Sequence, residues 1–177
     1  PIPKYLEREA TTDDAEQYQT IFAEIEGAIA PPAAGLHFTK ALMMRLEIKG
    51  VEFAKVNLNI GLGSFRPVEV EDLTKHKMDS EHFSIQQDAA DIVNNAKNNK
   101  KKVLAVGSSV MRALESSVSA FGMLNADDSW TDKFIFPPYE PRIANCYLTN
   151  FHEPQSTLMM LTSAYLDDHK LAMEVYN

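Results

Sequence analysis

A short apolar segment that leads directly into a helical pattern constrains the fold of this chain most. Residues 102–106 are apolar after Lys102 and rich in valine, and this composition is typical of a buried strand. Gly107, Ser108 and Ser109 then turn the chain into a helix predicted to run to about residue 121. A strand, a glycine turn and a helix in immediate succession indicate an α/β arrangement.

The predicted helix over residues 108–121 has two chemically different sides. At about 100° per residue its apolar residues share one side, and polar residues that include Arg112, Glu115 and Ser116 occupy the other. The simplest reading of Arg112 and Glu115 is an ion pair on the helix surface, because they are three residues apart.

Strands and helices alternate along the rest of the chain. Helices are predicted at 12–27, 39–48, 86–98, 156–166 and 168–177, and strands at 51–62, 83–85, 133–136 and 147–150, with extended chain at 1–10 and a polar loop at 122–129. This order predicts an α/β fold with mainly parallel strands and flanking helices. In such sheets ligands bind at the carboxyl ends of the strands, which here means residues 61–66, 107–109 and 150–156.

Composition narrows the class of protein. The 177 residues fit about one domain, and a single cysteine, Cys146, favours a reducing, cytoplasmic compartment. No apolar run approaches the ~18 residues of a membrane helix. The net charge of −8 argues against a generic nucleic-acid surface. Residues 97–102 form the one dense basic run, most simply a solvated helix end.

Four polar clusters fall in loops or at element ends: residues 35–39; residues 61–66 with His76 and Glu81; residues 107–116; and residues 149–157. The Ser108-Ser109 helix start suits an anion such as a carboxylate, and Gly61 and Gly63 permit close approach of the backbone to a flat ligand. His37 and His152 are candidate proton carriers near neutral pH. Each of these features also has a purely structural explanation. A lone histidine, for example, is more often a structural residue than a catalytic one. The histidine spacing and single cysteine offer no metal-site pattern.

The same clusters resemble a known family. Residues 34–39, 61–68, 80–81, 106–116 and 149–158 are similar, in order, to the signature segments of the S-adenosylmethionine:tRNA ribosyltransferase-isomerases of queuosine synthesis. The resemblance extends from Tyr5 to Tyr165. It implies an α/β-barrel-like catalytic domain, of which residues 1–177 form a single fragment. The opening strands, an inserted small β-barrel domain and the C-terminal tail are expected to be absent.

The resemblance also implies a reaction. S-adenosylmethionine would act as ribosyl donor to 7-aminomethyl-7-deazaguanine in a tRNA anticodon loop, giving epoxyqueuosine with release of adenine and methionine. No metal is expected. His37 or His152 would carry protons, and Arg66, Arg112 and Glu115 would position the reactants. The residues predicted to bind S-adenosylmethionine are Gly35, Phe38, Thr39, Gly61, Gly63, Ser64, Phe65, Arg66, Ser108, Ser109 and Asn150.

Several positions depart from the family pattern. Threonine is usual at Ala33, histidine at Asn59 and Asp79, glycine at Pro138 and aspartate at Asn145. A divergent paralogue with altered or lost activity, acting as an S-adenosylmethionine- or nucleoside-binding module, is therefore a second hypothesis. A third, an unrelated hydrolase or nucleotide-binding fold built on residues 107–109, lacks the expected nucleophile elbow or Walker lysine. Phosphate contacts to tRNA would come from residues 97–102, from missing parts or from a partner subunit.

Overall fold

The computed structural model describes residues 2 and 6–176. Outside these residues lie Pro1 and Pro3 of the predicted extended segment, Tyr5 at the start of the family resemblance, and Asn177 at the end of the last predicted helix. The described part mixes helices and strands, as the alternating pattern predicts. None of its helices combines the length and apolar character that a membrane crossing requires.

The strands form two separate sheets. β1 (Val56–Leu58), β2 (Glu81–Ile85) and β4 (Asp127–Thr131) make an antiparallel sheet in the order β1-β2-β4. β3 (Leu104–Val106) and β5 (Cys146–Leu148) form a parallel pair. The prediction of mainly parallel strands is therefore wrong. Only the 3-10 turns η3 (Leu62–Phe65) and η4 (Leu73–Lys75) separate β1 from β2, so no helix carries the chain back for parallel pairing. The barrel-like arrangement implied by the resemblance remains a prediction.

Two strand predictions fail because composition does not reveal pairing. β4 is polar, so it resembles a loop, yet all five of its residues pair with β2. Residues 133–136 are apolar after Lys133 but belong to no strand. Ile135 is buried in the core, and Phe134 packs on Phe136 with ring centroids 4.9 Å apart. These side chains are therefore packed without any pairing of their backbone with a neighbouring strand.

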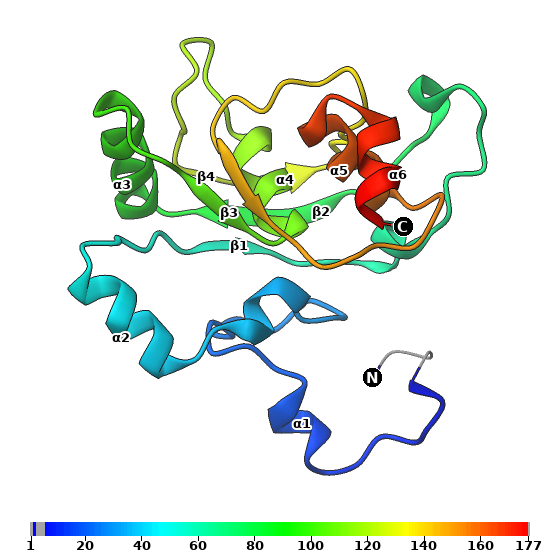
Figure 1. Cartoon of the computed structure of the whole chain (residues 1–177), viewed down its shortest axis with the longest axis horizontal. Coiled ribbons are helices and arrows are strands. Elements are labelled where there is room, and N and C mark those ends of the chain that lie inside the picture. The colour runs from blue at the N-terminus through cyan, green and yellow to red at the C-terminus, as the bar shows by residue number, and fades with distance from the viewer. Residues whose placement is uncertain (1, 3–5, 177) are drawn as a thin grey trace.

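The helices lie around the sheets as Figure 1 shows. α3 (Gln87–Asn98) lies at one end, α5 (Thr157–Leu166) and α6 (His169–Tyr176) lie together at the other, and α4 (Ser108–Ser116) lies between them. α2 (Lys40–Ile48) follows the 3-10 turn η2 (Ala33–His37), and both lie on the far side of β1 together with α1. The predicted boundaries of α2, α3 and α5 agree with the structure to within one residue.

The first predicted helix is much shorter than expected. α1 spans only Asp14–Gln17, although the apolar spacing continues to Ile25. Ile21 and Ile25 are exposed by 41% and 65%, so no core stabilises the rest of the helix. No side chain caps the start of α1, and Asp14 pairs with Arg8 at 2.7 Å.

α4 also differs from its prediction. It ends at Ser116 rather than near residue 121, and Phe121 is 93% exposed. Its buried residues are Met111, Arg112, Ala113, Leu114 and Glu115, so two charged side chains lie inside the molecule. The core around them is built from apolar side chains of both sheets, α3, α4 and α5, including Phe83, Ile85, Met111 and Leu161.

Candidate functional site

The parallel pair brings two of the predicted clusters together. Gly107, directly after β3, donates its backbone N–H to Leu148 O at the end of β5 over 2.9 Å. The Tyr147 hydroxyl is buried, which raises its pKa to about 12, and the hydroxyls of Thr149, Thr162 and Ser108 oppose that rise. Gly107 has a φ of 102°, a left-handed conformation that suits glycine, and this places the start of α4 at the same edge as residues 149–152.

The first cluster reaches this edge from η2. His37 Nε2 accepts a hydrogen bond from Asn150 Nδ2 at 3.2 Å, although 113 residues separate them. A Cβ at Gly107 would lie 3.8 Å from Pro32 Cβ, so the loop before η2 faces the start of α4. The contacts of His37 and Pro32 therefore join three of the four clusters.

Three other residues predicted from the first cluster have local contacts. A Cβ on Gly35 would meet the Thr20 side chain at 3.1 Å, and Phe38 packs on Phe22 with ring centroids 5.8 Å apart. Thr39 caps α2 by accepting the backbone N–H of Leu42 at 3.1 Å. These contacts hold the loop and helix that present His37.

A buried carboxylate, Glu81, organises the second cluster. Its Oε1 accepts the backbone N–H of Gly61 at 2.7 Å and the hydroxyl of Ser64 at 2.9 Å. Its Oε2 accepts from Arg112 Nη1. The side chains of Glu81 and Arg112 are only 2% and 4% exposed. The sequence places Glu81 in a signature segment but gives no reason to rank it above its neighbours, and the prediction omitted it.

Arg112 links the second cluster to the third. Nη1 also donates to Ser64 Oγ at 3.1 Å, and Nε donates to Lys133 O at 3.3 Å. The fourth cluster joins the same region, because Thr157 Oγ1 donates to Ser64 O at 3.3 Å. The predicted surface pair of Arg112 with Glu115 is wrong: Arg112 pairs with Glu81, 31 residues away.

Glu115 is fully buried and holds the chain before β5. Its carboxylate accepts the backbone N–H groups of Arg142 and Ile143 at 3.0 and 2.8 Å and the Tyr139 hydroxyl at 2.9 Å. Burial and the Glu115 charge raise the pKa of Tyr139, whereas burial lowers the pKa of Lys133, whose Nζ donates to Glu115 O. Both carboxylate oxygens of Glu115 therefore accept hydrogen bonds from the chain, and they hold Tyr139 and the backbone at Arg142 and Ile143 in place.

The glycines of the second cluster approach side chains of their own chain. A Cβ on Gly63 would lie 2.6 Å from Asp79 Cβ, and one on Gly61 would lie 3.7 Å from Glu81 Oε1. Arg66 pairs with Asp79 at 3.2 Å on the surface, and Phe65 is 55% exposed. At Gly63 the group that needs the space left by a missing side chain is therefore Asp79 of the same chain, and no flat ligand is needed to explain this glycine. Phe65 and Arg66 remain accessible to a ligand.

Two departures from the family pattern also make defined contacts. Asn145 Oδ1 accepts the backbone N–H of Val103 at 2.9 Å, next to the parallel pair. Asn59 Oδ1 accepts from Asn57 Nδ2 at 3.2 Å. Pro138 follows Pro137 through a cis peptide bond, and Ala33 begins η2. Together with Asp79, these residues sit within the framework of the site.

His152 lies in the fourth cluster but differs from His37 in its surroundings. Its Nε2 is 2.9 Å from Thr149 Oγ1, and its backbone N–H donates to the Tyr176 hydroxyl at 3.2 Å. Burial lowers the pKa of its imidazole from 6.5 to about 4. His152 is therefore neutral near pH 7, where it accepts or donates a hydrogen bond without carrying charge.

This pKa predicts a loss of stability in acid. Because the folded chain binds the His152 proton more weakly than the unfolded chain, the stabilisation is complete above about pH 6.5 and is lost as the pH falls toward 4. The ring is partly exposed, so we expect a contribution of about 1–2 kcal/mol. Urea unfolding at pH 7 and pH 4 measures it. The His152→Gln variant should lose less stability over this range, and an equal loss in both proteins would contradict the assignment.

Four buried side-chain atoms make no hydrogen bond of good geometry within the described residues: His76 Nε2, Arg112 Nη2, Tyr147 Oη and Asn150 Oδ1. Buried polar atoms are normally paired, because leaving one unpaired costs about 1–3 kcal/mol. His76, Arg112 and Asn150 belong to the predicted clusters, and Tyr147 lies two residues before one. Three of the four unpaired buried polar atoms thus belong to residues of the clusters where the sequence predicts a ligand.

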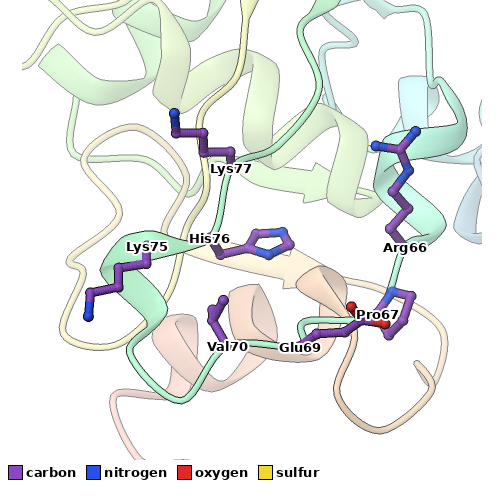
Figure 2. A pocket seen from close by; sticks show the side chains of 7 residues that line it. All are labelled: Arg66, Pro67, Glu69, Val70, Lys75, His76 and Lys77. Carbon is purple, nitrogen blue, oxygen red and sulfur yellow. The ribbon is translucent and has the colours of Figure 1, made fainter.

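Two hollows in the described part of the chain lie beside this region. One is lined by Arg66, Pro67, Glu69, Val70, Lys75, His76 and Lys77 (Figure 2). The other is lined by Phe83, Ser116, residues of β4, Asp132 and Lys133. Arg66 lines the first, but His37, Arg112 and His152 line neither. The clusters therefore converge through contacts, and neither of these two hollows is lined by all four predicted polar side chains.

Comparison with known proteins gives one family. The whole chain, residues 1–177, matches the family described as queuosine biosynthesis protein. A protein of Flavobacterium psychrophilum named S-adenosylmethionine:tRNA ribosyltransferase-isomerase is 61% identical over 176 residues, which cover 99% of this chain and 50% of that protein. A protein of the same name from Cytophaga hutchinsonii is 61% identical over 165 residues, covering 93% of this chain and 47% of its own length.

A solved structure supports the same relationship. The crystal structure of S-adenosylmethionine tRNA ribosyltransferase from Thermotoga maritima is similar with a TM-score of 0.61 and 30% sequence identity. The similarity covers 81% of this chain and 44% of the Thermotoga chain. The chain spans about half the length of the curated relatives it matches.

Proposed function

Because this chain belongs to the queuosine biosynthesis protein family, we propose that it carries part of the active site of an S-adenosylmethionine:tRNA ribosyltransferase-isomerase. The reaction we propose transfers and isomerises the ribosyl group of S-adenosylmethionine onto 7-aminomethyl-7-deazaguanine in tRNA. Adenine and methionine are released, and epoxyqueuosine is formed. The whole protein would be a transferase and isomerase of tRNA modification.

The observation that carries this proposal is that residues of the predicted clusters hold buried polar side-chain atoms without a hydrogen-bond partner among the described residues. Asn150 Oδ1 is buried and unpaired, and the other end of the same amide contacts His37. Arg112 Nη2 is buried and unpaired beside Ser64. An acceptor and a cationic donor left unpaired suit a polar ligand that brings both hydroxyl and anionic groups, as a ribosyl amino-acid sulfonium does.

The residues take different roles in this proposal. His37 is exposed enough to reach a ligand and is oriented by Asn150, so we assign it the proton transfer. His152, neutral near pH 7, is assigned a hydrogen-bonding role. The free backbone N–H groups at the start of α4, with Ser108 and Ser109, would hold the carboxylate of the methionine moiety.

Arg112 and Glu115 act mainly through other groups. The Glu81–Arg112 pair sets the position of Gly61 and Ser64, and Glu115 sets the chain at Arg142 and Ile143. We therefore assign both as positioning residues, while Phe65 and Arg66 are the accessible groups of the second cluster.

The direct test is release of adenine from S-adenosylmethionine by the intact protein, measured by liquid chromatography with a tRNA that carries the deazaguanine acceptor. We expect release that depends on this tRNA and is absent with a tRNA that carries unmodified guanine. Binding of S-adenosylmethionine in calorimetry without any release of adenine would contradict catalysis and support the binding-module hypothesis.

A further inference from the structure

The hollow lined by Arg66, Pro67, Glu69, Val70, Lys75, His76 and Lys77, here called the basic hollow, has a volume of about 280 Å³ (Figure 2). Three of its lining residues are cationic and one is acidic. The chain as a whole has a net charge of −8, so the sign of this surface is opposite to that of the molecule. A local excess of cations on an acidic protein indicates an anionic ligand.

His76 provides an unpaired donor in this hollow. Its Nε2 is buried without a hydrogen-bond partner among the described residues, and its ring packs on Phe134 at a centroid distance of 4.8 Å. Figure 2 shows the imidazole directed from the wall of residues 75–77 toward the wall that contains Arg66 and Pro67. A buried ring nitrogen that faces a hollow is satisfied when a ligand oxygen enters it.

The cations of the basic hollow are available to a ligand. Lys77 makes no ion pair within the part of the chain that the structure describes. Lys75 lies 3.5 Å from Asp72, but that carboxylate also accepts the Thr74 hydroxyl at 2.6 Å. Exposed pairs of this kind contribute about 0–1 kcal/mol, so a phosphate can replace them at little cost. Lysine stems are flexible enough for both amines to reach it.

The basic hollow adjoins the candidate site. Pro67 forms an antiparallel bridge with Ser156, and the backbone N–H of Val68 donates to Gln155 O at 2.7 Å. These contacts place one wall of the hollow against the segment that follows His152. Arg66 belongs both to the hollow and to the second predicted cluster.

We propose that the basic hollow binds a phosphodiester group of the RNA backbone, next to the nucleoside that reacts. This inference rests on the proposed function and extends it to the partner. His76 donates from its buried Nε2 to a phosphate oxygen, and Lys75 and Lys77 neutralise the charge from the rim. The exposed lysines of residues 97–102 serve as a control. They lie before β3, whereas the candidate site begins after the other end of that strand.

The test compares two double variants of equal charge in the intact protein. Lys75→Gln with Lys77→Gln should weaken binding of a fluorescent anticodon stem–loop RNA by about tenfold or more, measured by anisotropy at several salt concentrations. The slope of log K against log salt should become shallower by about 0.7–0.9, as expected when one phosphate is no longer neutralised. Lys100→Gln with Lys101→Gln should change affinity by less than about twofold.

His76→Phe tests the buried donor separately, because phenylalanine keeps the packing on Phe134 and removes the ring nitrogen. We expect about tenfold weaker RNA binding, from the loss of a charge-assisted hydrogen bond. Wild-type affinity in this variant and in the Lys75, Lys77 double variant would overturn the proposal. Inorganic phosphate that binds the wild type and binds both variants more weakly, while RNA affinity is the same in all three proteins, would also overturn it and indicate a free-phosphate site. Tight RNA binding without adenine release would instead contradict only the proposed function.

Discussion

Replacing Arg112 by methionine is expected to lower the free energy of unfolding by about 3–5 kcal/mol, because the change leaves the Glu81 carboxylate charged and buried without its partner. Glu81 is 2% exposed, and its other acceptors, Gly61 N–H and the Ser64 hydroxyl, are neutral. Methionine matches the length of the arginine stem and so keeps most of the packing. Urea denaturation of the wild type and the variant measures the loss.

Two further variants separate the ion pair from its surroundings. Arg66→Met removes the exposed pair with Asp79 by the same substitution and should cost less than about 1 kcal/mol. Combining Glu81→Gln with Arg112→Met removes both charges, so the double variant should be more stable than the sum of the single losses predicts by at least about 1 kcal/mol. Equal losses for Arg112→Met and Arg66→Met would show that burial does not set the strength of the Glu81 pair.

The consequence of this pair for activity is positional. The Glu81 carboxylate accepts from Gly61 N–H, the Ser64 hydroxyl and Arg112. Ser64 Oγ also accepts from Arg112, and Ser64 O accepts from Thr157. The loop that carries Phe65 and Arg66 is thereby tied to α4 and α5. A binding loop fixed in this way loses little conformational freedom when a ligand binds.

His37→Gln is expected to reduce the rate of adenine release by about 10²–10⁴-fold while the KM for S-adenosylmethionine changes little. His37 is the histidine of the site that is both accessible and oriented, since Asn150 Nδ2 lies 3.2 Å from its Nε2. Glutamine keeps a polar side chain that can contact Asn150 but cannot carry a proton near neutral pH. Single-turnover measurement of adenine release separates this step from product release.

Two controls make the result specific. His82→Gln applies the same change to a histidine that pairs with Asp128 at 2.7 Å on the antiparallel sheet, and it should leave the rate within about twofold of the wild type. Asn150→Ala removes the partner but keeps His37, so we expect about a tenfold reduction from lost orientation. A wild-type rate in His37→Gln would remove the proton-transfer assignment, and a large loss only in His152→Gln would transfer it to that residue.

The sequence by itself determined the family, most helices and the segments that meet at the site. Local interactions explain this success. Thr39 and Ser156 cap α2 and α5 through bonds to backbone groups three residues on, and the boundaries of α3 follow from its apolar spacing. The contact of His37 with Asn150, the bridge of Pro67 with Ser156 and the bond from Gly107 to Leu148 join clusters that the sequence had already singled out.

Only the tertiary structure decided which strands pair and which charges are buried. β4 is a strand because β2 provides hydrogen-bond partners, whereas its own residues are polar and predict a loop. Arg112 and Glu115 occupy the polar side of a helix, but they are buried because Glu81 and the backbone at Arg142 and Ile143 satisfy them. Those partners lie 27 to 31 residues away in the chain. Helix propensity and caps depend on near neighbours, whereas strand pairing and the neutralisation of buried charge depend on groups that only folding brings together.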